Sequence, residues 1–310
     1  MDLSITDIAD LDCIYLSYDE PQKEEFWIKI LNIVPWAKRV DGIKGSDAAH
    51  KAAAETSDTN FFVLIDGDNI PDADFFNLQI ETPNNDCAFR WKARNHINGL
   101  MYGNGGMSVW SKGFVNNMRT HEASDGSHET AVEFCFEETY YPMHNCYSTT
   151  YPNGSPFHAW RAGFREGVKM CLDRGRKPSL QEFDDNAKKR NLDHLQIWQT
   201  IGRDVEHGEE AINGARYGTY LTMLTDWDFT QVQDFDKLAE VYAEYLETTS
   251  VGRHNSMEQV TEMLNNRLAL NIVELDASTS QFFKYHYETG HNNLDMMTKE
   301  IDVIRRIEGW

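Results

Sequence analysis

The sequence FFVLIDGDNIPDADFF, residues 61–76, decides the predicted fold class. Its five leading apolar residues run directly into Asp66, Gly67 and Asp68. A short continuous apolar run bounded by turn residues is typical of a strand that is buried on both faces. In an open α/β sheet, the carboxyl end of such a strand lies at the ligand crevice. The stretch therefore predicts a buried parallel strand that presents two carboxylates at a binding site.

Strand and helix patterns alternate on the N-terminal side of this stretch. Residues 13–17 are a short apolar strand, residues 38–40 are a second short strand, and each is followed by a helical pattern, the first from Pro21 and the second over residues 47–56. This alternation predicts βαβ units, and hence an α/β fold with a mostly parallel sheet. Further strands are expected over residues 89–93 and 107–110.

The apolar spacing becomes helical after about residue 155 and stays helical to the end of the sequence. We therefore expect a nucleotide-binding domain over residues 1–155 and a mainly helical C-terminal region over residues 156–310 that completes the active site. The expected helices cover residues 157–172, 180–201, 208–224, 234–248, 256–273 and 292–308.

The composition indicates a globular protein. The 310 residues are 41% hydrophobic, which is enough for the core of one large or two modest domains. No apolar run is long enough to predict a transmembrane helix, and the acidic N-terminus does not resemble a signal peptide. The five cysteines are scattered without a CxxC spacing, so we expect reduced thiols in a cytoplasmic protein.

The charge is strongly negative overall but unevenly distributed. Against 50 acidic residues there are 29 basic ones, a formal net charge of −21, which opposes binding to nucleic acid. Residues 87–121 nevertheless contain basic residues and no acidic one, and much of the negative charge lies beyond residue 204. A locally positive middle segment therefore remains available for a polyanion.

Asp66 and Asp68 are candidate metal ligands. Two carboxylates this close repel one another unless a cation lies between them, and hard oxygen ligands suit Mg²⁺ or Mn²⁺. Gly67 permits a sharp turn and the close approach of a ligand. The alternative is an ordinary strand-ending turn rich in Asp, Gly and Asn, which binds nothing.

Several motifs together resemble a known class of enzyme. An acidic end to the first strand and a DxD at the end of the third resemble the GT-A fold of glycosyltransferases. In combination, the motifs resemble a glycosyltransferase-2-like family of tailed bacteriophages, some of whose members are thought to glycosylate modified bases in phage DNA, with arabinosyl and glucosyl transfer as possible types. The motifs, found between residues 11 and about 225, are SYDEP, AKRVDGIKG, FFVLIDGD, NGLMYGNGG and SPFHAWRAGFRE.

This resemblance implies a set of donor-site residues. Asp66 and Asp68 would hold Mn²⁺ or Mg²⁺ on the diphosphate of a UDP-sugar, and the glycines of NGLMYGNGG would lie beneath the donor sugar, where they let backbone amides approach. The alternatives are a solvated helix start for Asp19 and Glu20, a plain surface lysine for Lys44, and a surface loop or hairpin for the glycine segment. The residues implied to contact the nucleotide or sugar are Tyr18, Asp19, Glu20, Lys44, Gly45, Asp66, Gly67, Gly105, Gly106 and Lys169.

Glu133 is the candidate catalytic base, which an inverting transferase needs to deprotonate the acceptor hydroxyl. It lies between Val132 and Phe134, where an apolar environment would raise its pKa. A retaining enzyme would not require it. The other acids of the same segment are Glu129, Glu137 and Glu138.

The segment SPFHAWRAGFREGVKM predicts a helix with one basic face. Arg161, Arg165 and Lys169 recur at intervals of four, so they share a face that could stabilise a leaving diphosphate. Alternatively, the face is solvated and paired with acids such as Glu166. His158 is a candidate third metal ligand, in competition with His144.

The strand at 89–93 carries Arg90, Lys92 and Arg94 on one face. These side chains could contact acceptor phosphates, or they could pair with the acidic C-terminal helices and contact no nucleic acid.

The sequence therefore predicts a metal-dependent glycosyltransferase that uses a UDP-sugar. The resemblance suggests 5-hydroxymethylcytosine in phage DNA as acceptor. The alternatives are a protein, glycan or small-molecule acceptor, and a non-catalytic phage structural or interaction protein. No membrane partner is expected, and the sequence does not predict the oligomeric state.

Overall fold

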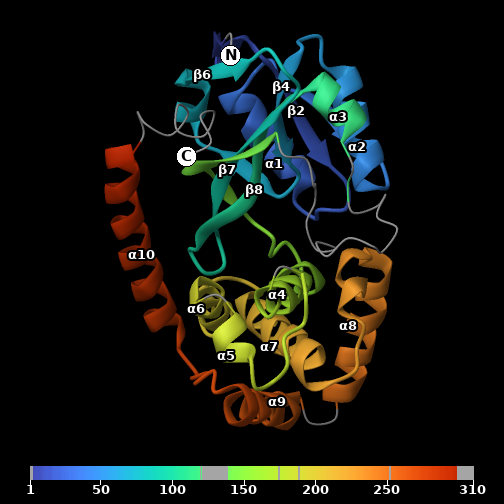
Figure 1. Cartoon of the computed structure of the whole chain (residues 1–310), viewed down its shortest axis with the longest axis vertical. Helices are drawn as coiled ribbons and strands as arrows, with labels where there is room; N and C mark the ends of the chain where they lie inside the picture. Colours follow the sequence, from blue (N-terminus) through green and yellow to red (C-terminus); the bar gives the residue numbers. More distant parts are fainter. Residues whose placement is uncertain are drawn as a thin grey trace. The chain divides into compact units, whose positions relative to one another are not determined.

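The computed structural model (Figure 1) describes residues 3–118, 120, 139–173, 175–187, 189–250 and 253–298. These residues group into two units. Unit 1 takes the described residues up to Thr120, those from Thr139 to Tyr151, and those from Tyr287 onward. Unit 2 takes the described residues of Pro152–His286.

Unit 1 is built on a mixed sheet of seven strands. Its strands are β2 (Asp12–Ser17), β3 (Lys38–Asp41), β4 (Phe61–Asp66), β5 (Asn69–Pro71), β7 (Ala88–Asn95), β8 (Met101–Ser111) and β9 (Tyr140–Thr150). They lie in the order β3-β2-β4-β8-β7-β9-β5. A separate antiparallel pair is formed by β1 (Leu3–Asp7) and β6 (Gln79–Pro83).

The expectation of a mostly parallel sheet was wrong beyond the first strands. β2 is parallel to both β3 and β4, as βαβ units require. β8 is antiparallel to β4, and it is antiparallel to β7 because a short turn joins the two as a hairpin. β9 is parallel to β7 and antiparallel to β5. Three pairings of this sheet are thus parallel and three antiparallel.

Helices cover both faces of the sheet. On one face, α1 (Lys23–Ile33) packs Phe26 and Ile30 against the odd-numbered residues of β2 and β4. On the other face, α2 (Ser46–Thr56) and α3 (Lys112–Asn117) pack against the even-numbered residues. Burial on both faces is the reason that 61–65 is continuously apolar, and Val63 and Ile65 are fully buried.

Unit 2 is helical. Its helices are α4 (Pro156–Met170), α5 (Phe183–Asn186), α6 (Lys189–Trp198), α7 (Gly208–Leu224), α8 (Phe235–Ser250), α9 (Arg253–Leu268) and α10 (Ala277–Thr298), the last of which continues into the residues grouped with unit 1. The single helix expected over 180–201 is divided into α5 and α6. Residues 292–298 of the helix expected over 292–308 are helical, although α10 begins earlier, at Ala277; residues 299–308 lie outside the described residues.

Glycines let α4 and α7 approach each other closely. A Cβ on Gly163 or Gly167 would lie 1.9 Å or 2.2 Å from a backbone oxygen of α7. Gly214 and Gly218 of α7 face the backbone of α4 in the same way. The four glycines therefore form a backbone-to-backbone contact that a side chain would prevent.

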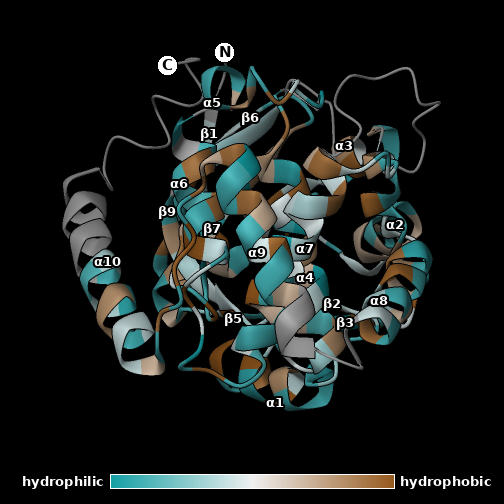
Figure 2. Ribbon diagram, turned by 90° about the horizontal axis from the view of Figure 1, so that it is seen from below, coloured by the Kyte–Doolittle hydropathy of each residue, from teal (hydrophilic) through white to brown (hydrophobic). Residues whose placement is uncertain are grey.

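The other helices of unit 2 pack through apolar stripes. Hydrophilic and hydrophobic residues alternate along α8 (Figure 2), and its buried Leu238, Val241 and Tyr245 follow helical spacing. Among the described helices of the chain, none is both long and apolar enough to cross a membrane.

Candidate active site

The candidate site lies where β2 and β4 end side by side. The two strands are parallel, and Leu16 of β2 pairs with Asp66, the last residue of β4. Each strand continues into an acidic segment, residues 18–20 after β2 and residues 66–68 at the end of β4, which we call the DGD turn. Because parallel strands deliver their carboxyl ends to one edge, these two segments meet.

Glu20 occupies the space beside Gly67. A Cβ built on Gly67 would lie 2.4 Å from the Glu20 carboxyl carbon and oxygen. The φ angle of Gly67 is not positive, so close approach of Glu20, rather than backbone conformation, is what requires glycine here. The Glu20 carboxylate also accepts a hydrogen bond of 2.7 Å from the backbone N–H of Tyr18.

The side chains of Glu20, Asp66 and Asp68, which we call the carboxylate cluster, repel one another. Burial raises the pKa of Asp66 to about 8, and the charges of Asp68 and Glu20 contribute to the rise. Burial also raises the pKa of Glu20, with further contributions from Asp68 and Asp19. Such a cluster is stabilised either by taking up protons or by a cation.

The donor chemistry of the cluster fits a divalent ion that is shared with a phosphate. In the described part of the chain, no three carboxylate, imidazole or thiolate groups converge closely enough to hold a metal by themselves. Mg²⁺ and Mn²⁺ commonly use one or two protein carboxylates and take their other ligands from phosphates and water. Asp66 and Asp68 can provide such a partial set of ligands.

A polar network that the sequence did not predict lies beside the cluster. The Ser17 hydroxyl donates to Asp41 at 2.7 Å, and the Lys23 ammonium contacts Asp41 at 2.8 Å. Burial acts to raise the pKa of Asp41, but the Lys23 and Ser17 hydrogen bonds outweigh it and the pKa is lowered. The pairing of Ser17 with Asp41 at the parallel ends of β2 and β3 creates this network.

The remaining predicted nucleotide residues of unit 1 lie on nearby loops. Tyr18 and Asp19 are exposed after β2. Lys44 is exposed in the loop before α2, and Gly45 caps that helix with a φ angle of 96°, which favours glycine. The loop is tied to β2 by a hydrogen bond of 3.0 Å from the Gly42 N–H to the Ser17 carbonyl.

The glycine segment belongs to a β-hairpin, one of the alternatives predicted, because residues 96–100 join β7 to β8 and residues 101–106 lie in β8. β8 already begins at Met101, and its ladder with β7 pairs Trp91 with Met107 and Ala93 with Tyr102. Residues 103–106, which include Gly105 and Gly106, are therefore a bulge opposite Lys92. Ile65 of β4 and Met107 of β8 form the last residue pair between these antiparallel strands. The bulge, which precedes Met107, therefore lies next to the DGD turn, which follows Ile65.

The predicted residues of α4 belong to unit 2. The side chain of Ser155 caps the helix by accepting the N–H of His158 at 3.2 Å, and the His158 Nδ1 atom lies 2.7 Å from the same hydroxyl. Arg161 and Arg165 place their guanidinium groups 4.4 Å and 4.9 Å from the ring centre of Phe235.

Lys169 contacts Glu166 at 3.4 Å, which agrees with the alternative of a basic face paired with acids. On the other side of α4, Trp160, Phe164 and Val168 are fully buried, as expected.

Other candidate residues lie outside the described residues. These are Glu129, Glu133, Glu137, Glu138 and the side chain of His144, whose backbone is part of β9.

The basic face of β7 has intramolecular partners. The guanidinium group of Arg90 lies 3.3 Å from the ring centre of Tyr140. Arg94 forms an ion pair of 3.0 Å with Glu288 of α10. The second of the two alternatives for this face, pairing with the acidic C-terminal helices, is therefore observed for Arg94.

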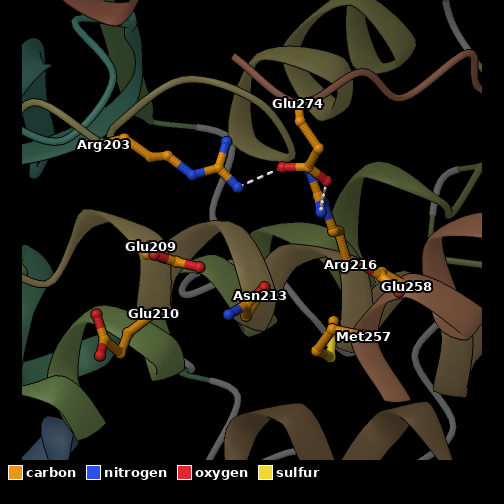
Figure 3. Close-up of a pocket in the computed structure, with 8 residues that line it drawn as sticks. All are labelled: Arg203, Glu209, Glu210, Asn213, Arg216, Met257, Glu258 and Glu274. Atoms are coloured by element: carbon orange, nitrogen blue, oxygen red, sulfur yellow. Dashed lines mark hydrogen bonds and ion pairs between the residues drawn. The ribbon is translucent and has the colours of Figure 1, made fainter. Parts of the chain in front are cut away.

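A cavity in unit 2 contains none of the predicted site residues (Figure 3). It has a volume of about 260 Å³. Arg203 and Arg216 are both directed at Glu274, and Arg216 contacts it at 2.5 Å. Arg203 also donates to the Leu275 carbonyl at 2.7 Å, so both arginines hold the segment after α9, while Arg216 donates in addition to the Gln199 carbonyl.

Comparison with known proteins adds no assignment. No protein-family model matches the chain, and no curated protein is significantly similar to it.

Proposed function

We propose that the chain is a metal-dependent glycosyltransferase of GT-A type that uses a nucleoside-diphosphate sugar, with a UDP-sugar as the expected donor. The observation that supports this most is the carboxylate cluster at the adjacent ends of β2 and β4. Burial and mutual repulsion raise the pKa of Asp66 to about 8, so the site favours a compensating cation. A structural turn would have no need of three acidic side chains beside a glycine.

The residues of the cluster have different parts in this proposal. Asp66 and Asp68 would hold Mn²⁺ or Mg²⁺, which would neutralise the diphosphate as it leaves. Glu20 closes the space beside Gly67 and holds the segment after β2 through the Tyr18 N–H. Lys23 and Asp41 fix the neighbouring strand ends, so that a nucleoside would meet an ordered polar surface. Roles for Glu133, Arg161, Arg165, Lys169 and His158 stay predictions.

Two kinds of acceptor remain candidates. The resemblance to the phage family suggests the hydroxymethyl group of modified cytosine in DNA. A protein, glycan or small-molecule acceptor is favoured by the ion pair of Arg94 with Glu288, because it leaves the basic strand less free to contact phosphates. The net charge of −21 acts in the same direction.

A transfer assay tests the proposal. Labelled UDP-sugars are incubated with Mn²⁺ and either DNA containing 5-hydroxymethylcytosine, the same DNA with plain cytosine, or glycan and protein acceptors. The expected result is labelled product with the wild type and none with Asp68→Asn, while Asp58→Asn, which changes an exposed acid before the opposite end of β4, stays active. If no donor and acceptor pair gives product, or if Asp68→Asn is fully active, the proposal is wrong.

A further inference from the structure

The orientation of the Gly67–Asp68 peptide in the DGD turn matters for Asp68. The carbonyl of Gly67 and the N–H of Asp68 belong to one peptide plane, so rotation of this plane moves the Asp68 carboxylate. Gly67 has no Cβ to restrict that rotation. A site that binds a cation through Asp68 therefore needs a separate contact that fixes the Gly67 carbonyl.

Tyr15 supplies that contact. Its hydroxyl donates a hydrogen bond of 2.7 Å to the Gly67 carbonyl, across from β2 to the end of β4. The side chain is fully buried and belongs to the same core as Val63 and Ile65. This buried hydrogen bond constrains the Gly67 carbonyl, and the next carbonyl along the chain, that of Asp68, accepts the N–H of Tyr151 at 2.7 Å.

The tyrosine ring is itself held firmly. The ring of Trp27 stacks on it at 5.9 Å between centres and 8° between planes. The guanidinium group of Arg39 lies 5.6 Å from its centre and is fixed by two hydrogen bonds to Glu24, of 2.8 Å and 2.7 Å. The hydroxyl also lies 3.3 Å from the Lys23 carbonyl, at the first turn of α1. The position of the hydroxyl is thus determined by α1, β2 and β3 together.

We propose that Tyr15 is a positioning residue of the donor site, which orients the Gly67–Asp68 peptide, and hence the Asp68 carboxylate, for a divalent cation bound with a nucleoside diphosphate. This inference depends on the proposed function. It adds a residue that the sequence motifs do not include, because Tyr15 lies inside an apolar strand. Tyr15 acts through Gly67 and does not need to touch the cation or the sugar.

The test compares Tyr15→Phe with Tyr147→Phe. The first variant keeps the stacked ring and removes the hydroxyl. The second removes a hydroxyl from the same core, where the Tyr147 ring packs near Phe75 rather than at the DGD turn. Calorimetry measures the affinity for Mn²⁺ and for UDP in its presence. We expect Tyr15→Phe to bind Mn²⁺ about threefold to tenfold more weakly, the range of one net hydrogen bond, and Tyr147→Phe to bind as the wild type does.

Each other outcome has a distinct meaning. Equal affinity in all three proteins overturns the role of Tyr15 and leaves the proposed function intact. Equal weakening in both variants assigns the effect to the core and also overturns that role. A wild type that binds neither Mn²⁺ nor UDP overturns the proposed function, and this inference with it.

A second measurement applies if Tyr15→Phe does not fold. Wild-type protein labelled with ¹³C at the tyrosine hydroxyl-bearing carbon is titrated with Mg²⁺ and UDP. The Tyr15 resonance is expected to shift more than that of Tyr147. The absence of such a difference overturns the inference.

Discussion

Replacement of Asp66 by Asn should stabilise the folded protein, and the gain should grow with pH. Asp66 has a pKa of about 8 in the folded protein against 3.8 for a free side chain, because burial and the charges of Asp68 and Glu20 disfavour its ionised form. An acid whose pKa is raised on folding contributes stability that is fully present below its unfolded pKa and is lost as the pH rises toward the folded value. Asparagine does not titrate and avoids this loss.

The magnitude follows from the pKa difference. One pKa unit corresponds to about 1.4 kcal/mol, so a rise of about four units gives a total of up to about 6 kcal/mol. Between pH 5 and pH 8 the unfolding free energy of Asp66→Asn should therefore exceed that of the wild type by a margin that grows by up to about 4 kcal/mol. This figure is an upper limit, because Asp66 keeps partial contact with solvent.

Urea unfolding at a series of pH values in EDTA measures this margin. The control is Asp12→Asn, at the opposite end of β2. Burial acts to raise the pKa of Asp12, but hydrogen bonds from Lys38 and the Asp58 backbone outweigh it and the pKa is lowered. The stability that Asp12 contributes is present above its unfolded pKa and is lost only in acid, so Asp12→Asn should be less stable by a constant amount from pH 5 to pH 8. A margin for Asp66→Asn that does not change with pH would refute the reasoning. When Mn²⁺ replaces EDTA, it should stabilise the wild type and narrow the difference in unfolding free energy between Asp66→Asn and the wild type.

Three further predictions concern other contacts. Gly167→Ala places a Cβ 2.2 Å from the Ala215 carbonyl oxygen and should lower the unfolding free energy by at least about 2 kcal/mol in urea melts, despite the better helix propensity of alanine; unchanged stability would contradict the close approach of α4 and α7. Gly67→Ala should displace the flexible Glu20 side chain and weaken Mn²⁺ binding. In a protein that already carries Glu20→Ala, the same change should lower the affinity for Mn²⁺ little further. Additive losses of affinity in calorimetry would show that the two residues do not meet. If DNA is the acceptor, Glu288→Gln should free Arg94 and steepen the salt dependence of DNA retention in gel shifts by about one unit of slope; an unchanged slope would mean that Arg94 does not reach phosphate.

The first half of the sheet was predictable because its residues carry strong local signals. β2 and β4 are largely apolar strands, and α2 and α7 have clear helical spacing. Four glycines close together in the sequence instead suggested a loop at residues 99–106. β8 takes in most of that segment, because Met101 and Tyr102 pair with Arg94 and Ala93 of β7, a pairing that no local pattern reveals.

The start of α10 is marked in the sequence by a helix N-cap. Asp276 accepts the N–H of Thr279 at 2.8 Å, a typical helix N-cap, so the motif DAST predicts a helix from Ala277. The end of α9 was harder to predict, because Ala269 and Asn271 adopt positive φ angles of 51° and 52° without a glycine.

The candidate site was predictable only in part. Asp66, Gly67 and Asp68 stand together in the sequence at the end of a buried strand. The contributions of Tyr15, Lys23 and Asp41 depend on the arrangement of β2 with β3, β4 and α1, which brings residues 18 to 52 positions apart into hydrogen-bond contact. Such contacts between parallel strand ends follow from tertiary structure and leave no motif.

The central claim is that the carboxylate cluster binds a divalent ion together with a nucleoside diphosphate. The most direct test is a thermal or urea stability measurement with UDP-sugars, with and without Mn²⁺, on the wild type and Asp68→Asn. At a hundredfold excess over Kd, a true donor should stabilise the wild type by about 2.7 kcal/mol when Mn²⁺ is present, and Asp68→Asn much less. If no sugar nucleotide stabilises the wild type, or if both proteins respond equally, the carboxylates do not form a donor site.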